Sequence, residues 1–346
     1  MTKIISLFNN KGGVGKTTLL WNLADSIARN NKRVLMIDFD PQCNLSLAVL
    51  GTNVFTETLP TLNASYGTTI RAYLQRFIQN TKGFEFFSHQ GKNTHQDAEL
   101  VAGDFWLNVY AESLSVGSDL LTGIGVVKYI VLRDMLSFAN QEAERKGQKL
   151  YDYALVDLPP SFGALVRAAL YSSDYFIVPC TSDLYSAYCV GLIGEMLPGF
   201  FEDWKSGFTR FKRANPQLSK YDNIGSPKFA GWVFNGFDTR NQDFVTVDKT
   251  HHDKIANSVS QRLVPKLKDS ICMNLPTSYK IGQIEDMNVL VQNSIWHNVP
   301  VSQLGNFRPL KTLQDRGSWT IDQLEQIERL GRQFDEIAKQ IISNCI

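Results

Sequence analysis

Hydrophobic positions along the chain form short continuous runs that alternate with stretches of helical periodicity. Apolar runs of this kind, bounded by polar or glycine-rich segments, are typical of strands that are buried on both faces. Their alternation with helices predicts an α/β fold with a mostly parallel, twisted sheet flanked by helices. The predicted strands lie at 4–8, 33–40, 151–160, 173–180 and 228–237, and the predicted helices at about 16–29, 126–146, 183–204, 245–263, 281–296 and 320–343.

Residues 51–104 interrupt this pattern. The segment is polar and aromatic with weak periodicity, and within it only 68–79 has the spacing of a helix. The chain contains no internal repeat and no low-complexity tract. We therefore interpret 1–346 as a single domain that carries an insertion at about 51–104.

The composition is typical of a soluble globular protein, because 43% of the 346 residues are hydrophobic and 20% are charged. The formal net charge is +1, so any surface for nucleic acid or membrane has to be a local patch. No apolar run approaches the ~18 residues that a membrane span needs. The first residues lead into a strand without the long apolar region of a signal peptide. A soluble intracellular protein is expected.

The segment KGGVGKTT (11–18) follows the first predicted strand and opens the first predicted helix. It is a modified form of the phosphate-binding pattern G-x-x-x-x-G-K-[ST], because Asn10 stands where the first glycine is usual. Glycines let backbone N–H groups curl round an anion at the helix start, while a lysine and a hydroxyl reach the β/γ-phosphates and Mg²⁺. Nucleotide contacts are predicted for Gly12, Gly13, Val14, Gly15, Lys16, Thr17 and Thr18. Thr18 either touches the α-phosphate or only starts the helix.

Acidic residues stand at the ends of two further predicted strands. Asp38 and Asp40 lie in DFDPQCN (38–44), and Asp157 closes the apolar run in YDYALVDLPPS (151–161). Carboxylates at the ends of parallel strands are well placed for metal-assisted chemistry on a bound nucleotide. For Asp38, an acid that caps a loop is the alternative.

These segments together resemble the ParA/MinD superfamily of deviant Walker A P-loop ATPases, and most of all its ParA-type partition ATPases. KGGVGKTT resembles the deviant Walker A motif, and DFDPQCN resembles the family's D-x-D-P-Q-G-N motif. YDYALVDLPPS and the following SDYFIVPCTSDLYSAYCVG resemble the Walker B strand with the next strand and turn. The resemblance covers most of the chain except about 51–104. It implies a P-loop NTPase fold, ATP and Mg²⁺ as ligands, and ATP hydrolysis as the reaction.

The resemblance also implies roles for single residues. Asp40 would position the attacking water, and Thr17, Asp38 and Asp157 would serve the Mg²⁺ ion. Lys16 would bind phosphates in its own site, whereas Lys11, the signature lysine, would reach the phosphates of a dimer partner as an arginine finger does. A solvent-facing lysine is the alternative for Lys11.

Two positions fit the family pattern less closely. Asn235 resembles the asparagine that contacts adenine, but an asparagine that completes a strand-end turn fits about equally well. Cys43 stands where the family has a glycine. Because cysteine disfavours a positive φ, we expect the turn at Cys43 to differ slightly from the family's.

The resemblance places non-specific DNA contacts at Arg240 in DTRN and at Lys280 in PTSYK. A second candidate surface is WKSGFTRFKR (204–213) with Lys220 and Lys228, which combines basic and aromatic residues. An ordinary solvated surface explains that second segment equally well.

The last predicted helix argues against a membrane. MinD-type proteins end in a basic amphipathic helix, whereas the polar face here carries five acids (Asp322, Glu325, Glu328, Asp335 and Glu336) against three bases (Arg329, Arg332 and Lys339). That is the wrong sign for an anionic membrane surface. We expect this helix to pack on the sheet.

The sequence therefore predicts a ParA-type ATPase that forms a homodimer on ATP binding and binds DNA non-specifically. It would position plasmid, chromosome or other cargo, with hydrolysis stimulated by a ParB-like or adaptor protein, in the cytoplasm and on the nucleoid. Two rivals remain, namely a MinD-like membrane-cycling ATPase and a metabolic P-loop ligase or reductase with 51–104 as a substrate lid. The cargo, the partner protein and the role of 51–104 are not identified by the sequence.

Overall fold

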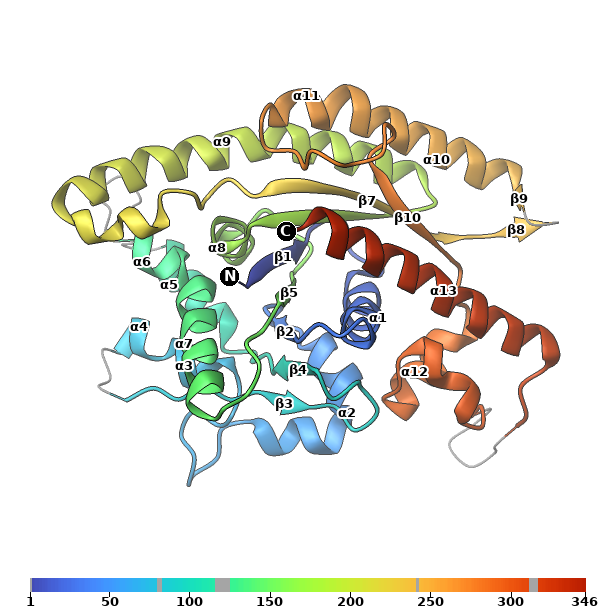
Figure 1. Ribbon diagram of the computed structural model, residues 1–346, viewed down its shortest axis with the longest axis horizontal. Coiled ribbons are helices and arrows are strands. Elements are labelled where there is room, and N and C mark those ends of the chain that lie inside the picture. Colours follow the sequence, from blue (N-terminus) through green and yellow to red (C-terminus); the bar gives the residue numbers. More distant parts are fainter. Residues whose placement is uncertain (1, 80–82, 116–124, 241–242, 311–316) are drawn as a thin grey trace.

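The computed structural model describes residues 2–79, 83–115, 125–240, 243–310 and 317–346. Within them, an eight-stranded sheet runs through the molecule in the order β10-β7-β6-β1-β5-β2-β4-β3 (Figure 1). Neighbouring strands are parallel, except that β3 and β4 are antiparallel. The strands are β1 (Lys3–Leu7), β2 (Val34–Asp38), β3 (His89–Gln90), β4 (Ala98–Val101), β5 (Tyr153–Asp157), β6 (Tyr175–Thr181), β7 (Lys228–Phe237) and β10 (Lys280–Glu285), with a separate pair β8 (Thr239–Arg240) and β9 (Asp243–Phe244).

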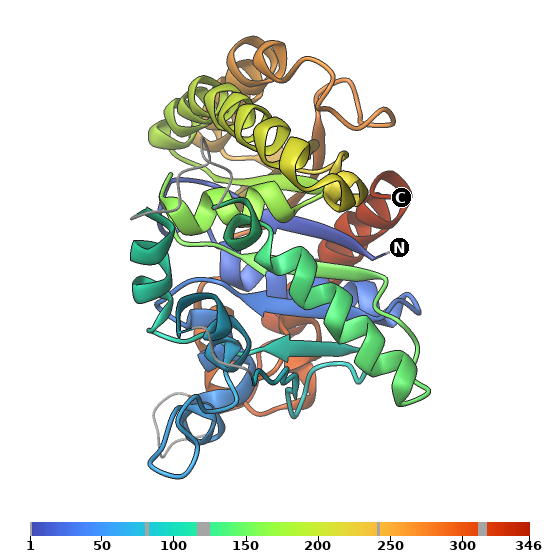
Figure 2. The ribbon, with the colours of Figure 1, turned by 90° about the vertical axis from the view of Figure 1, so that its left-hand side faces the viewer.

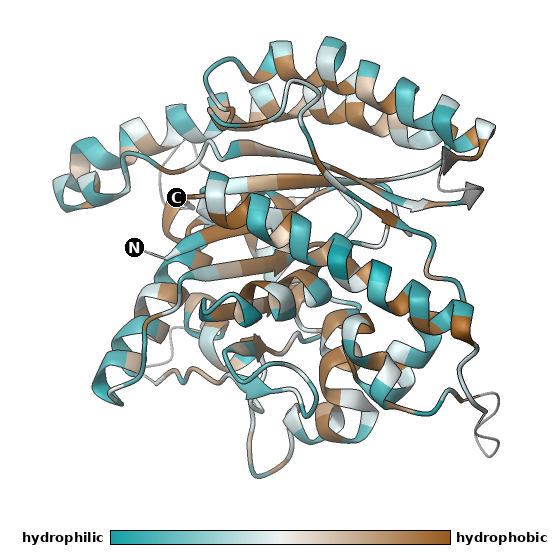
Figure 3. Cartoon of the chain, turned by 45° about the vertical axis from the view of Figure 1, so that its right-hand side comes forward, coloured by the Kyte–Doolittle hydropathy of each residue, from teal (hydrophilic) through white to brown (hydrophobic). Residues whose placement is uncertain are grey.

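Alternate residues of the central strands point into two hydrophobic cores, one on each face of the sheet. In β2, Leu35 and Ile37 belong to one core, whereas Val34 and Met36 belong to the other, as the two-residue period of a strand requires. Helices cover both faces (Figure 2), and their apolar positions contrast with hydrophilic outer positions (Figure 3). The core with Val34 is closed by α1 (Lys16–Arg29), α2 (Asn44–Thr58), α12 (Val289–His297) and α13 (Ile321–Asn344). The opposite core is closed by α3 (Ile70–Leu74), α5 (Leu107–Ser115), α6 (Val126–Tyr129), α7 (Val131–Arg145), α8 (Ala164–Ser172), α9 (Leu184–Ala214), α10 (Thr246–Ser258) and α11 (Val264–Leu267).

The predicted α/β class is confirmed, and the five strands expected from the sequence are present as β1, β2, β5, β6 and β7. The predicted helix at 281–296 is wrong in its first part. Residues Lys280–Glu285 form β10, which pairs with β7, and α12 begins only at Val289. A short apolar run does not distinguish a strand from a helix by periodicity alone.

Segment 51–104 contributes to the sheet, which the interpretation as an insertion did not foresee. Its helices α3 and α4 (Arg76–Gln79) agree with the helix predicted at 68–79. Its last part forms β4, which pairs with β2, and β3 adds an antiparallel edge. Ala98, Leu100 and Val101 are buried, so this end of the segment belongs to the core. A strand of four residues is too short to give a periodic signal.

Helix α9 is longer than predicted and continues to Ala214. By length and composition it is the one described helix that could cross a membrane, with 44% of its most apolar 18-residue window buried. It packs against α10 and β6. Gly194 lies so close to the neighbouring helix that an added Cβ would be 2.3 Å from the backbone oxygen of Arg262. These contacts are those of a core helix.

Helix α13 packs on the sheet, as the charge pattern of its polar face suggested. A capping box between Thr320 and Gln323 starts the helix. Its buried face contacts α1 and β10, and Gly282 of β10 allows the close approach, because an added Cβ there would lie 2.2 Å from Ile337. Ile321, the first residue of α13, is 76% exposed.

Both ends of the described chain lie at the amino edge of the sheet. Thr2 precedes β1, and Ile346 accepts a hydrogen bond on its main-chain oxygen from the Tyr175 hydroxyl at 2.9 Å. Thr2 and Ile346 line the same cavity of about 790 Å³, together with residues at the start of β5.

The turn before α2 keeps a left-handed residue although a cysteine occupies it. Cys43 has φ +55° and ψ +29° and is the N-cap of α2, so the expectation that the cysteine avoids a positive φ was wrong. Its backbone N–H donates to the Asp40 carbonyl oxygen at 2.9 Å. The start of α2 at this point requires the left-handed backbone conformation, although cysteine disfavours it. This conformation costs a residue other than glycine about 1–2 kcal/mol.

We predict that Cys43→Gly will be more stable than Cys43→Ala by about 1 kcal/mol, because glycine adopts this conformation without strain. Free energies of unfolding from urea titrations measure the difference. Lys339, on the exposed side of α13, is the matched control. At that position the alanine variant should be more stable than the glycine variant by about 1 kcal/mol. If the alanine variant were the more stable one at both positions, the backbone of Cys43 would not be strained.

Candidate functional site

The loop between β1 and α1 wraps round the first turn of α1. Gly13 and Gly15 have φ values of +72° and +75°, which glycine adopts readily. Gly15 is the N-cap of α1, and no side chain caps this end of the helix. The first N–H groups of α1 are therefore left to bind an anion.

Asn235 at the end of β7 supports this loop from behind. Its Nδ2 donates to the Val14 carbonyl oxygen at 3.0 Å. A Cβ at Gly15 would lie 2.3 Å from the same Nδ2 atom. Glycine at position 15 is thus required by the side chain of Asn235 as well as by the backbone conformation.

Lys16 is the first residue of α1 and is buried. Its Nζ donates to the carbonyl oxygens of Asn9 at 3.2 Å and Lys11 at 3.1 Å. Burial lowers the pKa of Lys16, while the charges of Asp157 and Asp40 act in the opposite direction. Both carboxylates therefore face the same small volume as the amine.

Thr17 and Asp157 join α1 to the end of β5. The Thr17 hydroxyl donates to Asp157 Oδ2 at 2.7 Å, whereas Asp157 Oδ1 is buried and has no hydrogen-bond partner. Burial raises the pKa of Asp157 to about 6, against the effect of the Thr17 hydroxyl. An unpaired buried carboxylate oxygen beside a hydroxyl fits a divalent cation.

Thr17 and Asp157 do not form a complete metal site by themselves. Among the described residues, no group of three or more His, Cys, Asp or Glu side chains could hold a metal ion. Mg²⁺ usually takes only one or two protein ligands and completes its shell with water and phosphate oxygens. Thr17 and Asp157 match that requirement.

Asp40 faces the pocket, and Asp38 lies behind it. Asp40 Oδ1 accepts from the Gln42 N–H at 2.9 Å. Asp38 Oδ2 instead accepts from the N–H and the hydroxyl of Ser46 in α2, at 2.8 and 2.6 Å. Burial, followed by the charge of Asp157, raises the pKa of Asp38 to about 8. Asp38 therefore anchors α2, and its contact with the Mg²⁺ shell stays a prediction.

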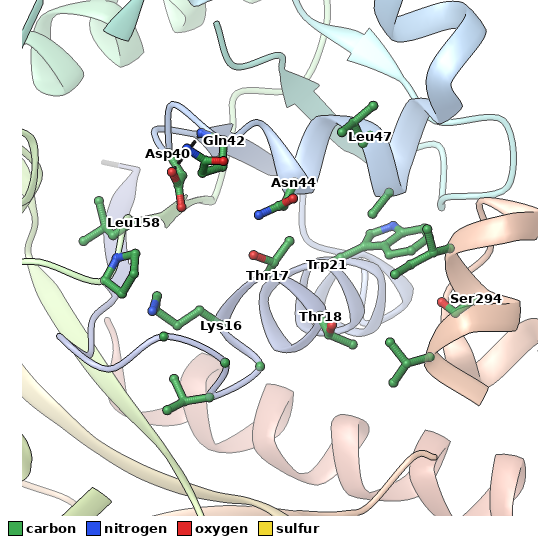
Figure 4. A pocket seen from close by; sticks show the side chains of 18 residues that line it. Lys16, Thr17, Thr18, Trp21, Asp40, Gln42, Asn44, Leu47, Leu158 and Ser294 are labelled. Carbon is green, nitrogen blue, oxygen red and sulfur yellow. Dashed lines mark hydrogen bonds between the residues drawn. The ribbon is translucent and has the colours of Figure 1, made fainter. Parts of the chain in front are cut away.

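A cavity of about 480 Å³ lies over the loop. Figure 4 shows Lys16, Thr17 and Asp40 around one end of it and Trp21, Leu47 and Ser294 at the other. The first end is polar and lies at the phosphate loop, whereas the second is largely apolar. A phosphate chain with a flat, partly apolar group attached matches this division.

Lys11 points away from this cavity. Its Nζ forms an ion pair with Asp183 and donates to the Thr181 hydroxyl at 3.0 Å. Asp183 and Thr181 lie at the junction of β6 and α9. The two lysines of the loop thus have separate surroundings, and only Lys16 lines the cavity.

A family described as an AAA domain matches residues 2–203, more than half of the chain. The chromosome-partitioning protein ParA of Myxococcus xanthus is 30% identical over 184 residues, which are 53% of this chain and 54% of that protein. The chain belongs to the ParA/MinD family. It spans only about half the length of this curated ParA relative.

Solved structures from the ParA/MinD family share the fold. McdA of Cyanothece, in a complex with ATP, gives a TM-score of 0.59 at 15% identity, covering 98% of this chain and 96% of that one. The ParA of pNOB8, bound to nonspecific DNA, gives 0.55 at 17% identity, covering 99% and 98%. At these identities the likeness establishes the fold alone.

The adenine and DNA contacts expected from the ParA/MinD resemblance stay predictions. Asn235 is tied to Val14 and does not line the cavity. Arg240 lies in β8, and its side chain is outside the described part of the structure. Lys280 is half-buried, with Nζ 3.1 Å from His252 Nε2 and 2.9 Å from Gln283 Oε1.

The alternative basic segment 204–213 is less suited to nucleic acid than its sequence suggested. Trp204 and Phe208 are buried and stack on each other with ring centroids 5.4 Å apart. Lys212 is paired with Asp222 at 2.8 Å. The aromatic residues of this segment therefore serve the core, and its exposed positions are basic or hydroxyl residues.

Several cavity residues of this ParA/MinD-family chain were not assigned from the sequence. Gln42 and Asn44 follow Asp40 within the quoted motif DFDPQCN, so the motif itself could have indicated them. Val291, Ser294 and Ile295 come from α12. They follow the wrongly predicted part of 281–296, and no sequence signal places them opposite the loop.

We predict that Lys16→Ala will weaken ATP binding by about a hundredfold, because a charge-assisted contact contributes up to about 3 kcal/mol. Titration with a fluorescent ATP analogue measures this. Lys32→Ala, which removes a half-exposed lysine from the turn after α1, is the matched control and should bind normally. Equal affinities in the two variants would remove Lys16 from the phosphate site.

Proposed function

We propose that this protein is a ParA-type ATPase that binds Mg²⁺-ATP, forms a homodimer, binds DNA non-specifically, and positions plasmid, chromosome or other cargo. A ParB-like or adaptor protein would stimulate its hydrolysis step. The observation that carries the proposal is the pair of lysines in one loop, with Lys16 inside the cavity beside Asp40 and Asp157 and Lys11 outside it.

The polar residues at the loop would bind the nucleotide and its metal ion and orient the attacking water. Lys16 would exchange the carbonyl oxygens of Asn9 and Lys11 for β/γ-phosphate oxygens. Thr17 and Asp157 would hold Mg²⁺, which supplies charge neutralisation at the phosphates when bound. Asp40, oriented by the Gln42 N–H, would hold the attacking water.

Dimer formation is supported by the surface beside Lys11. The first turns of α9 expose three large side chains, with Leu184 at 58%, Tyr185 at 73% and Tyr188 at 55%. Apolar and aromatic side chains of this kind are frequent at protein interfaces. They adjoin Asp183 and thus the lysine that would act on a partner's phosphates.

Neither rival is favoured by a specific observation. The polar face of α13 carries the wrong charge for a membrane surface, and the helix packs on α1 and β10. A metabolic enzyme would use 51–104 as a substrate lid, but none of the described residues of this segment lines the cavity. Non-specific DNA binding, as named for the pNOB8 ParA, would place the protein in the cytoplasm and on the nucleoid.

We predict that Asp40→Ala will lower ATP turnover by about a hundredfold or more, since a group that orients and activates water contributes at least that factor. The variant should accumulate as an ATP-bound dimer. Turnover is measured by phosphate release and the dimer by analytical ultracentrifugation.

Two other variants complete this test. Asp222→Ala, at an exposed residue paired with Lys212, should behave as wild type. Lys11→Ala should retain ATP binding but lose both turnover and the ATP-dependent dimer. Unchanged turnover in Asp40→Ala would remove Asp40 as the water-positioning group.

We predict that Arg240→Ala and Lys280→Ala will each weaken ATP-dependent DNA binding and lower the slope of log affinity against log salt by about 1, as loss of one phosphate contact requires. Mobility shifts with ATP, with ADP and without nucleotide provide the measurement. Lys339→Ala on α13 is the control. Unaltered affinity and slope in both variants would place the DNA surface elsewhere.

A further inference from the structure

The side chain of Lys11 is bound within its own chain. Its amine forms an ion pair with Asp183 and donates to the Thr181 hydroxyl at 3.0 Å. That hydroxyl in turn donates to Asp183 Oδ2 at 2.6 Å. Lys11 and Asp183 are mostly covered, with side-chain exposures of 24% and 31%. The three side chains form a closed network in which the amine has two oxygen partners.

Asp183 cannot follow the lysine if the loop or the lysine side chain moves. It is the N-cap of α9, and its Oδ1 accepts from the Ser186 N–H at 3.0 Å. Ser186 is buried, and α9 is a core helix of 31 residues. The carboxylate is therefore fixed to the body of the molecule, whereas Lys11 lies on the loop and has a flexible side chain.

The charge balance at Asp183 agrees with a strong hold on the lysine. Burial acts to raise the pKa of Asp183, but the hydrogen bonds from Lys11 and Thr181 outweigh it and keep the pKa below its ordinary value. Asp183 therefore stays ionised at neutral pH and attracts the ammonium group continuously.

We propose that Asp183 is a positioning residue that holds Lys11 against α9 in the free chain, and that Lys11 must leave Asp183 before it can reach phosphates bound by a second copy. The inference rests on the proposed function, because only a dimer gives Lys11 a second destination. It adds a competition between two anionic partners for one ammonium group. Dimer formation is thereby restrained until a partner's phosphates are present.

The size of the restraint follows from the exposure of the pair. Partly exposed ion pairs shift an equilibrium by about threefold. A symmetric dimer has to break two such pairs, so the combined restraint is about tenfold in the dimerisation constant.

Asp183→Asn is the variant that isolates the charge. Asparagine caps a helix as well as aspartate does, so α9 should start normally while the ion pair is lost. Asp222→Asn, which removes the charge from an exposed pair with Lys212 far along the chain, is the matched control. Circular dichroism and thermal unfolding should agree among these variants and the wild type.

The first measurement is made on the nucleotide-free monomer. Amine-directed labelling, read residue by residue by mass spectrometry, should modify Lys11 about threefold faster in Asp183→Asn than in the wild type or Asp222→Asn. This readout requires no dimer and no ATPase activity. Equal labelling of Lys11 in all three proteins would contradict the hold by Asp183.

The second measurement is the dimerisation constant with Mg²⁺ and a non-hydrolysable ATP analogue, from sedimentation. Asp183→Asn should dimerise about tenfold more tightly than the wild type, and the matched control Asp222→Asn should dimerise as tightly as the wild type. A wild-type dimer with an unchanged or weaker Asp183→Asn dimer would overturn the proposal and leave the proposed function intact. Absence of a dimer in every variant would instead overturn the proposed function and, with it, the release step.

Discussion

The in-register pairing of β1, β5 and β2 is the constraint on which the rest of the molecule depends. It sets Asp157 opposite Leu7 on one side and Asp38 on the other, at the carboxyl edge of a buried sheet. Two carboxylates buried side by side are costly unless other groups satisfy them. The compensation comes from the first turns of two helices, through Thr17 of α1 and Ser46 of α2. The contacts that shape the site are therefore also contacts that fix two helices on the sheet.

The loop between β1 and α1 is held from several parts of the chain at once. Asn235 of β7 binds the Val14 carbonyl oxygen from behind, and Asp183 before α9 holds Lys11 at the front. Asn235 lies in β7 and Asp183 follows β6, and both strands lie on the same side of β1 in the sheet. Movement of β6 or β7 relative to β1 would consequently be transmitted to the loop through these hydrogen bonds, without any change at the cavity itself.

Most of the fold and the phosphate loop could be predicted because their signals are local. Each central strand is a continuous apolar run, and KGGVGKTT carries its glycines, its lysine and its hydroxyl within one segment. The errors lie where tertiary contacts decide. Strands β4 and β10 are short and become strands through pairing with β2 and β7. Cys43 adopts a left-handed conformation because α2 has to begin there.

Side-chain partners far apart in sequence could not be predicted at all. Lys11 and Asp183 are 172 positions apart, and neither residue type nor spacing indicates the pairing. The position of Asn235 behind Gly15 is a similar case, since the same residue type equally suited a turn or a base contact. Trp204 and Phe208 led to the opposite error. Aromatic residues among basic ones suggested a binding surface, but the helix directs both side chains into the core.

The location of Thr2 and Ile346 in one cavity has a practical consequence for cell biology and protein engineering. Both residues lie at the amino edge of the sheet, the length of a strand away from the loop that begins after Leu7. A fluorescent protein or an affinity handle attached at either residue would be separated from the cavity over the loop by the length of a strand.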